Sequence, residues 1–113
     1  MKLAIIGSRT LTQISLDSYI PHGVTEIVSG GAKGIDTLAR EYARRSGLPI
    51  TEILPRYNLY GRAAPIRRNA EIAEYADVGI AFWDGKSKGT LHTIRLFERL
   101  GKEITVIRID VDS

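Results

Sequence analysis

Short apolar runs alternate with amphipathic segments along this chain of 113 residues. The apolar runs end at glycine or at polar residues, and unbroken runs of this length are typical of strands that are covered on both faces. We expect five strands, at Leu3–Ile6, Thr25–Ser29, Ile50–Leu54, Val78–Phe82 and Ile104–Ile109.

The segments between these runs carry apolar residues at helical spacing. The clearest stripe predicts a helix that ends at Ser46, with one face formed by Ile35, Leu38, Ala39, Tyr42 and Ala43. Gly47 and Pro49 then supply the stop signal. Further helices are expected at about Gln13–Ile20, from Pro65 to Tyr75 and from Thr90 to Leu100, with a loop at Pro55–Ala63.

Strands that alternate with helices predict a parallel sheet, because each right-handed crossover starts the next strand at the same edge. We predict an α/β fold, a Rossmann-like three-layer α/β/α sandwich with a five-stranded parallel sheet in the order 3-2-1-4-5. Residues 1–113 are expected to form a single domain, because the sequence contains no linker, repeat or low-complexity segment.

The strongest local signal is the stretch 29–36, Ser-Gly-Gly-Ala-Lys-Gly-Ile-Asp, at a strand-to-helix turn. Glycine permits positive φ and lets the backbone approach a ligand closely. The first N–H groups of a helix have no partner within it, and the helix dipole favours an anion there. The loop therefore predicts a phosphate cradle, beside the alternative of a tight turn that needs glycine sterically. It matches neither the G-x-G-x-x-G pattern nor the Walker loop.

Two further loops, residues 7–10 and 83–90, also combine glycine with hydroxyl and charged side chains. In an open parallel sheet, ligands bind at the carboxyl ends of the strands where the strand order reverses, which here lies between strands one and four. One ligand site accounts for all three loops together. The predicted ligand-binding residues are Gly7, Ser8, Arg9, Gly30, Gly31, Ala32, Lys33, Gly34, Asp36, Arg68, Asn69, Asp84, Gly85, Ser87, Gly89 and Thr90.

The cationic candidates have structural alternatives. Arg9 contacts a phosphate or base, or covers the sheet edge in water. Lys33 is expected in solvent, because the glycine backbone would bind the anion. Arg68 is preferred to Arg67, whose partner Glu71 lies four residues on and favours a helix-surface pair.

The remaining polar and aromatic candidates are equally open. Asp36 orients a ribose hydroxyl or serves as a carboxylate at a helix start. Tyr57 and Tyr60 stack on a base or pack over their loop. Trp83 is a base platform or a core residue, and His92 is an isolated helix histidine without an evident catalytic partner.

Composition narrows the functional classes. The formal net charge of +3 and the pI of about 9.4 suit an anionic ligand. Without cysteine and with only two histidines, the chain is not expected to hold a protein-ligated metal. No apolar run is long enough to span a membrane. The lack of cysteine fits a reducing compartment, and we expect a cytoplasmic protein.

Five sequence elements, taken together and in this order, resemble the SMF/DprA–LOG (SLOG) superfamily, in particular its small YspA-like members. They are Gly7-Ser8-Arg9, Ser29 to Asp36, Tyr60-Gly61-Arg62-Ala63-Ala64, Arg68-Asn69 and Trp83 to Thr90. The likeness spans nearly the whole chain and implies a Rossmann-like nucleotide-binding domain. It implies a nucleotide or nucleotide-derived ligand whose phosphate lies on the backbone of Gly30–Gly34 and Gly89–Thr90.

The resemblance leaves the activity open. One branch is similar to phosphoribohydrolases, which cleave the base–ribose bond of a nucleoside monophosphate with a glutamate in Pro-Gly-Gly-x-Gly-Thr-x-x-Glu and an upstream arginine. This chain keeps Gly89-Thr90 and Arg68 but has Thr93 at the glutamate position. A hydroxyl neither stabilises an oxocarbenium-like centre nor acts as a base near neutral pH. We therefore expect ligand binding or sensing, with no catalytic residue assigned.

The DprA branch of the superfamily binds single-stranded DNA, which is the second alternative. Such binding combines basic side chains with stacking aromatics, and the candidates here are Arg56, Tyr57, Tyr60 and Arg62. The resemblance also implies a homodimer, for which Leu96 and Phe97 are candidate contacts unless they belong to the core.

Overall fold

The computed structural model describes residues 1–11, 13–31 and 33–109, so the predicted ligand residue Ala32 lies outside the described residues. One sheet is formed by β1 (Lys2–Gly7), β2 (Glu26–Ser29), β3 (Ile50–Glu52), β4 (Val78–Trp83) and β5 (Ile104–Arg108). All neighbouring strands are parallel, and their order is β3-β2-β1-β4-β5. The predicted fold class and strand order are confirmed.

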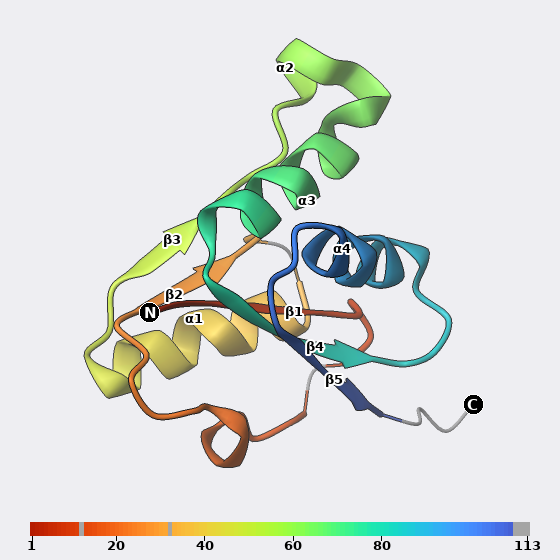
Figure 1. The fold of residues 1–113 in the computed structure, drawn as a ribbon. Coiled ribbons are helices and arrows are strands. Elements are labelled where there is room, and N and C mark those ends of the chain that lie inside the picture. The colour runs from red at the N-terminus through yellow and green to blue at the C-terminus, as the bar shows by residue number, and fades with distance from the viewer. Residues whose placement is uncertain (12, 32, 110–113) are drawn as a thin grey trace.

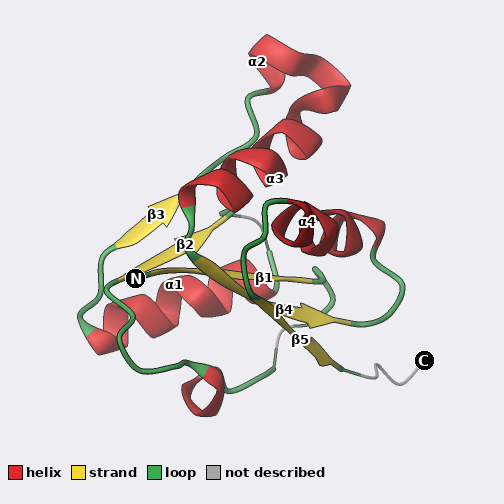
Figure 2. Ribbon diagram, in the orientation of Figure 1, coloured by secondary structure: helices red, strands yellow, loops and turns green. Residues whose placement is uncertain are grey.

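Helices cover both faces of this sheet (Figures 1 and 2). The helix α1 (Ile35–Ser46) covers one face, and α3 (Ala64–Tyr75) and α4 (Lys88–Arg99) lie together on the other. Alternate residues of β1 serve the two layers: Leu3 and Ile5 pack with α1, whereas Ala4 and Ile6 pack with the residues of α3 and α4. This burial on both faces explains the unbroken apolar run.

The helix predicted at Gln13–Ile20 is wrong, because only the 3₁₀ turn η1 (Asp17–Tyr19) forms in this segment. Leu16 is buried, and Ile14 packs against the same apolar cluster. An α-helix would place side chains two residues apart roughly 160° from each other, so it would turn one of the two away from the core. The irregular path lets both pack inward.

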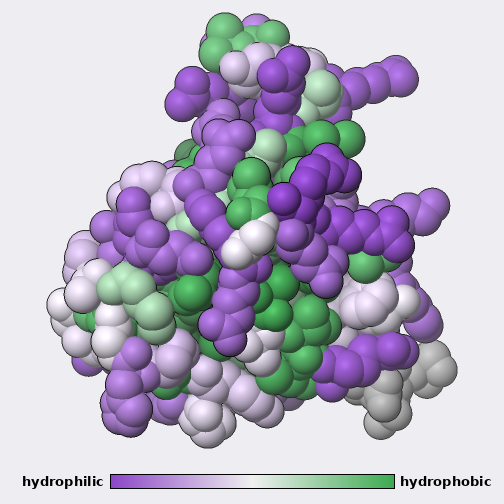
Figure 3. Space-filling view, in the orientation of Figure 1, coloured by the Kyte–Doolittle hydropathy of each residue, from purple (hydrophilic) through white to green (hydrophobic). Residues whose placement is uncertain are grey.

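The loop predicted at Pro55–Ala63 is also wrong in part, because it contains α2 (Tyr57–Tyr60) and the 3₁₀ turn η2 (Gly61–Ala63). We call residues 56–63 the arm. It stands away from the sheet in Figure 1, and Figure 3 shows hydrophobic and hydrophilic residues mixed at this end of the molecule. Tyr57 and Leu59 are 58% and 62% exposed.

The helix α4 packs against α3 through buried apolar side chains. Phe97 is fully buried, and Leu96 packs against the same apolar cluster as α3. Both residues named as candidate dimer contacts therefore contribute to the core in this chain. None of the described helices combines the length and apolar character needed to cross a membrane.

A candidate ligand site at the carboxyl edge of the sheet

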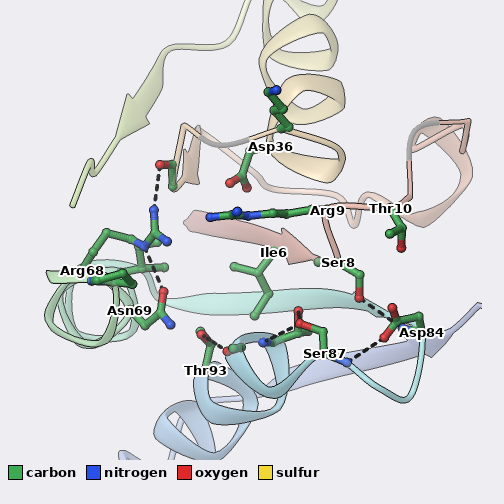
Figure 4. Close-up of a pocket in the computed structure, with 17 residues that line it drawn as sticks. Ile6, Ser8, Arg9, Thr10, Asp36, Arg68, Asn69, Asp84, Ser87 and Thr93 are labelled. Carbon is green, nitrogen blue, oxygen red and sulfur yellow. Dashed lines mark hydrogen bonds between the residues drawn. The ribbon is translucent and has the colours of Figure 1, made fainter. Parts of the chain in front are cut away.

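A cavity of about 430 Å³ opens beside the carboxyl ends of β1 and β4, where the strand order reverses. Figure 4 shows the side chains that point into it. They come from the end of β1 and the loop after it, the segment from the end of β2 to the start of α1, the helix α3, and the β4–α4 loop with the first two turns of α4. The loops that the topology predicted to meet do meet at one cavity.

Most of the predicted ligand residues line this cavity, namely Gly7, Ser8, Arg9, Gly30, Lys33, Asp36, Arg68, Asn69, Asp84, Ser87, Gly89 and Thr90. Three predicted residues do not line it. They are Gly31, Gly34 and Gly85, whose φ angles are +69°, +74° and +80°. These three glycines therefore shape the turns, since a positive φ disfavours other residues.

Sequence reasoning missed four lining residues, Ile6, Thr10, Pro65 and Ile72, and gave Thr93 no binding role. Helical periodicity contains a signal for three of these five. Pro65 and Ile72 lie about one turn before and after Arg68, and Thr93 lies one turn after Thr90.

Two glycines allow the loops to touch at the sheet edge. A Cβ on Gly34 would lie 2.5 Å from the carbonyl oxygen of Arg9, so the start of α1 packs directly on the loop after β1. A Cβ on Gly7 would lie 2.5 Å from Cγ1 of Ile35 and 2.7 Å from the carbonyl oxygen of Phe82. Their close packing fixes one side of the cavity as part of the fold.

Arg68 ties α3 to the end of β2. Its Nη1 donates a hydrogen bond to the carbonyl oxygen of Gly30 at 2.9 Å, and its Nε donates to Oδ1 of Asn69 at 2.9 Å. Burial lowers the pKa of the Arg68 guanidinium, while Asp36 opposes this shift and Arg9 adds to it. The group stays protonated, and these bonds use two of its five N–H donors.

Arg9 extends across the cavity with its guanidinium toward Asp36 and Arg68 (Figure 4). It forms no hydrogen bond or salt bridge with any residue in the described part of the chain. Two guanidinium groups and one carboxylate thus share this wall, so positive charge is in excess there. Lys33 lines the same side and is exposed.

Asp84 organises the opposite wall. Its Oδ1 accepts hydrogen bonds from the N–H groups of Lys86 and Ser87, each at 2.8 Å. These two amides, helped by the Ser8 hydroxyl, hold the pKa of Asp84 below its ordinary value. The N–H group of Asp84 donates in turn to Oγ of Ser8 at 3.3 Å. The loop that was predicted to receive a phosphate therefore already holds an anion of its own.

The start of α4 is capped by Ser87. Its Oγ accepts the N–H group of Thr90 at 3.3 Å and lies 3.0 Å from the Thr90 hydroxyl. The N–H groups of Lys88 and Gly89 have no acceptor among the described residues. Only part of the backbone cradle predicted at Gly89–Thr90 is thus available, because the protein itself uses the Thr90 amide.

Gly89 differs from the other glycines of the site. It lies in the first turn of α4 with negative φ, and apart from its chain neighbours and its own helix backbone no described heavy atom lies within 4 Å of the place where its Cβ would be. Neither backbone geometry nor packing against described residues explains a glycine here. The residue leaves room on the cavity side of the helix.

The cavity holds no carboxylate at the position of Thr93. The Thr93 hydroxyl donates to the carbonyl oxygen of Gly89 at 3.0 Å, so its proton is already engaged in the helix. The carboxylates that line the cavity are Asp36 and Asp84, whereas Glu71 does not reach it. Within the described residues, no group of three or more acidic or histidine side chains is placed to bind a metal.

The aromatic candidates lie at the margin. Trp83 Nε1 donates to the carbonyl oxygen of Ser87 at 3.0 Å, so the indole supports the α4 loop. Arg67 is exposed and lies over the ring of Tyr60, 5.0 Å from its centroid, so it faces the surface as predicted. Among the described residues it forms no salt bridge with Glu71, its predicted partner. His92 does not line the cavity, and its buried Nδ1 has no hydrogen-bond partner in the described structure.

Comparison with known proteins places the chain beside a phage protein. The Gene 61 protein of Mycobacterium phage D29 is 37% identical over 87 residues, which cover 72% of this chain and 69% of the phage protein. No family model matches the chain, and no solved structure gives a significant match. From its identity and its coverage of the relative, the chain belongs to the same protein family as the Gene 61 protein of Mycobacterium phage D29.

Proposed function

We propose that this protein is a small SLOG-type domain that binds or senses a nucleotide or a nucleotide-derived molecule. The observation that carries the proposal is the cavity at the reversal of the strand order, which three glycine-containing loops and α3 build together. In open parallel sheets this position is the usual ligand site. The volume of about 430 Å³ is in the range of small-molecule pockets.

The side chains of the cavity support a ligand that is both anionic and rich in hydroxyl groups. Arg9 and Arg68 supply positive charge, and the half-buried Asp36 lies near them as an acceptor for sugar hydroxyls. Ser87 and Thr90 add hydroxyl groups on the far wall. A nucleoside phosphate carries the complementary groups in one small molecule.

Hydrolysis of the base–ribose bond is the less favoured activity. A glycosidase needs a carboxylate that acts as nucleophile or base at the anomeric carbon. Thr93 stands at the expected position and donates to its own helix, and Asp84 is engaged by two backbone amides. We therefore assign binding without a catalytic residue.

Isothermal titration calorimetry tests the proposal. The protein is titrated with nucleoside monophosphates, NAD-derived molecules and cyclic dinucleotides, and we expect saturable binding of at least one at a ratio of one per chain. The same mixtures are analysed by chromatography for released base, which we expect to be absent. Lack of binding across the whole panel would overturn the proposal, and base release would restore the hydrolase.

A second candidate function rests on the arm. Tyr57 and Tyr60 are 58% and 37% exposed, and no acidic residue occurs between Ile53 and Ala70. Exposed aromatics among arginines favour stacking and phosphate contacts with single-stranded nucleic acid. Binding to labelled oligonucleotides that weakens steeply with salt is the expected signature, and salt-independent or absent binding would exclude it.

A further inference from the structure

The two walls of the cavity differ in charge. One wall carries Arg9, Lys33 and Arg68 with a single carboxylate, Asp36. The other carries the hydroxyl groups of Ser8, Ser87, Thr90 and Thr93 with the carboxylate of Asp84. Figure 4 shows Arg9 and Asp36 on one side of the Ile6 side chain, and Ser87 and Thr93 on the other. A ligand with one anionic end and one hydroxyl-bearing end would thus meet an asymmetric site.

The positive wall holds more cationic groups than its one carboxylate, Asp36, can balance. Arg9 makes no hydrogen bond or salt bridge within the described residues, although its guanidinium reaches into the cavity. Its charge disfavours the charged form of Arg68, since it acts to lower the pKa of that group. Like charges held together in a cavity are stabilised by an anion between them. Arg9 and Arg68 are therefore poised for a phosphate or carboxylate.

The opposite wall is occupied by the protein's own groups. The Asp84 carboxylate takes the N–H groups of Lys86 and Ser87, and the Ser87 hydroxyl takes the N–H group of Thr90. A phosphate beside Asp84 would meet a negative charge and few free amides. The hydroxyl groups there suit neutral partners such as sugar hydroxyls.

We propose, resting on the proposed function, that the ligand binds with its anionic group against Arg9 and Arg68 and its hydroxyl-bearing part against Ser87, Gly89 and Thr90. This orientation differs from the one expected from the glycine-threonine element, in which the phosphate lies on the start of α4. It specifies the ligand class as a molecule with one terminal anionic group, of which a nucleoside 5′-monophosphate is the probe.

Matched calorimetry tests the orientation with adenosine 5′-monophosphate and adenosine, and with the corresponding guanine, cytosine and uracil pairs. In Arg9→Gln we expect the affinity for the monophosphate that binds to fall about ten- to a hundredfold, because a charge-assisted hydrogen bond is lost. The affinity for its nucleoside should stay within about twofold. Gly89→Ala, which places a methyl group on the hydroxyl wall, should weaken both compounds by the same factor. Arg95→Gln removes an exposed positive charge outside the cavity and should change neither.

The reverse result overturns the orientation: the phosphate-dependent gain in affinity survives in Arg9→Gln and disappears in Gly89→Ala. An NMR titration with inorganic phosphate tests the orientation even if no nucleotide binds. A failure of every nucleotide to bind would contradict only the proposed function. We expect phosphate to shift the Arg9 Nε–H and Gly30 amide signals and to leave those of Lys88 and Gly89 in place. Shifts confined to Lys88 and Gly89, or no shifts, would contradict the orientation.

Discussion

Replacing Gly89 by alanine should make the protein more stable and its ligand binding weaker. Gly89 has negative φ in the first turn of α4, and the space around its missing Cβ is open. Glycine in a helix costs up to about 1 kcal/mol relative to alanine, and about half of that is expected in a first turn. We therefore expect the free energy of unfolding to rise by roughly 0.5 kcal/mol.

Gly34 supplies the matched contrast, since it also lies at the start of a helix. Its φ is +74°, and its Cβ would lie 2.5 Å from the Arg9 carbonyl oxygen and 2.8 Å from the carbonyl carbon. Both atoms belong to the backbone, so they cannot turn away as a side chain would. The strained conformation alone costs about 1–3 kcal/mol, and with the clash we expect Gly34→Ala to lose about 2–4 kcal/mol.

Urea denaturation followed by circular dichroism measures both variants under one set of conditions. The account predicts opposite signs: a higher midpoint for Gly89→Ala and a lower one for Gly34→Ala. Calorimetry then shows whether the more stable variant binds its nucleotide less tightly. If Gly89→Ala unfolds at lower urea than the wild type, the glycine serves the fold, and its assignment to ligand access is refuted.

Three further substitutions test contacts in the structure. Lys102 Nζ donates to three carbonyl oxygens around the end of α3, each at 2.8 Å, so Lys102→Met should lower the free energy of unfolding by about 1–3 kcal/mol. Urea denaturation should show this loss and calorimetry an unchanged ligand affinity, whereas an unchanged urea midpoint would contradict the capping role of Lys102. The pKa of Asp84 is depressed below its ordinary 3.8, so the Asp84 carboxylate stabilises the fold above that pH, and this contribution is lost as the pH falls through the lower folded pKa. In Asp84→Asn the free energy of unfolding should therefore fall less steeply at acidic pH. A slope equal to that of the wild type would count against the contacts of Asp84 with the two amides. Arg68→Gln removes the hydrogen bond to the Gly30 carbonyl and one of the two guanidinium groups of the cavity, so both the urea midpoint and the affinity for the monophosphate should fall. A loss of affinity at unchanged stability would show that the hydrogen bond to Gly30 contributes little to the fold.

The fold was predictable because the central strands are buried on both faces and therefore consist of apolar residues without interruption. The runs at Leu3–Ile6 and Val78–Phe82 are apolar without interruption, since both of their faces are covered, and this pattern fixes them as central strands. The alternation with helices then predicts parallel strands, and a Rossmann-like order places these two strands in the middle of the sheet. The segment Gln13–Ile20 failed because its apolar residues serve an irregular path, which leaves no helical period to read.

The position of the site in the fold could be predicted from the sequence, but the side-chain contacts within it could not. Parallel topology brings the loops after β1, β2 and β4 to one edge, so most lining residues could be named. The bond from Arg68 to Gly30 joins residues 38 positions apart, and the sequence contains no local sign of it. Asp84 was named as a ligand residue, yet its carboxylate turns back onto the amides of its own loop, a local choice that only side-chain geometry reveals.

The central claim is that loops from separate parts of the chain form one site for one anionic ligand. A ¹H–¹⁵N NMR titration with the nucleotide that binds in calorimetry tests this most directly. The account predicts that the backbone signals of Ser8 and Arg9, of Gly30, and of Gly89 and Thr90 shift together and fit one dissociation constant. Shifts in only one of these loops, or shifts that fit different constants, would contradict it.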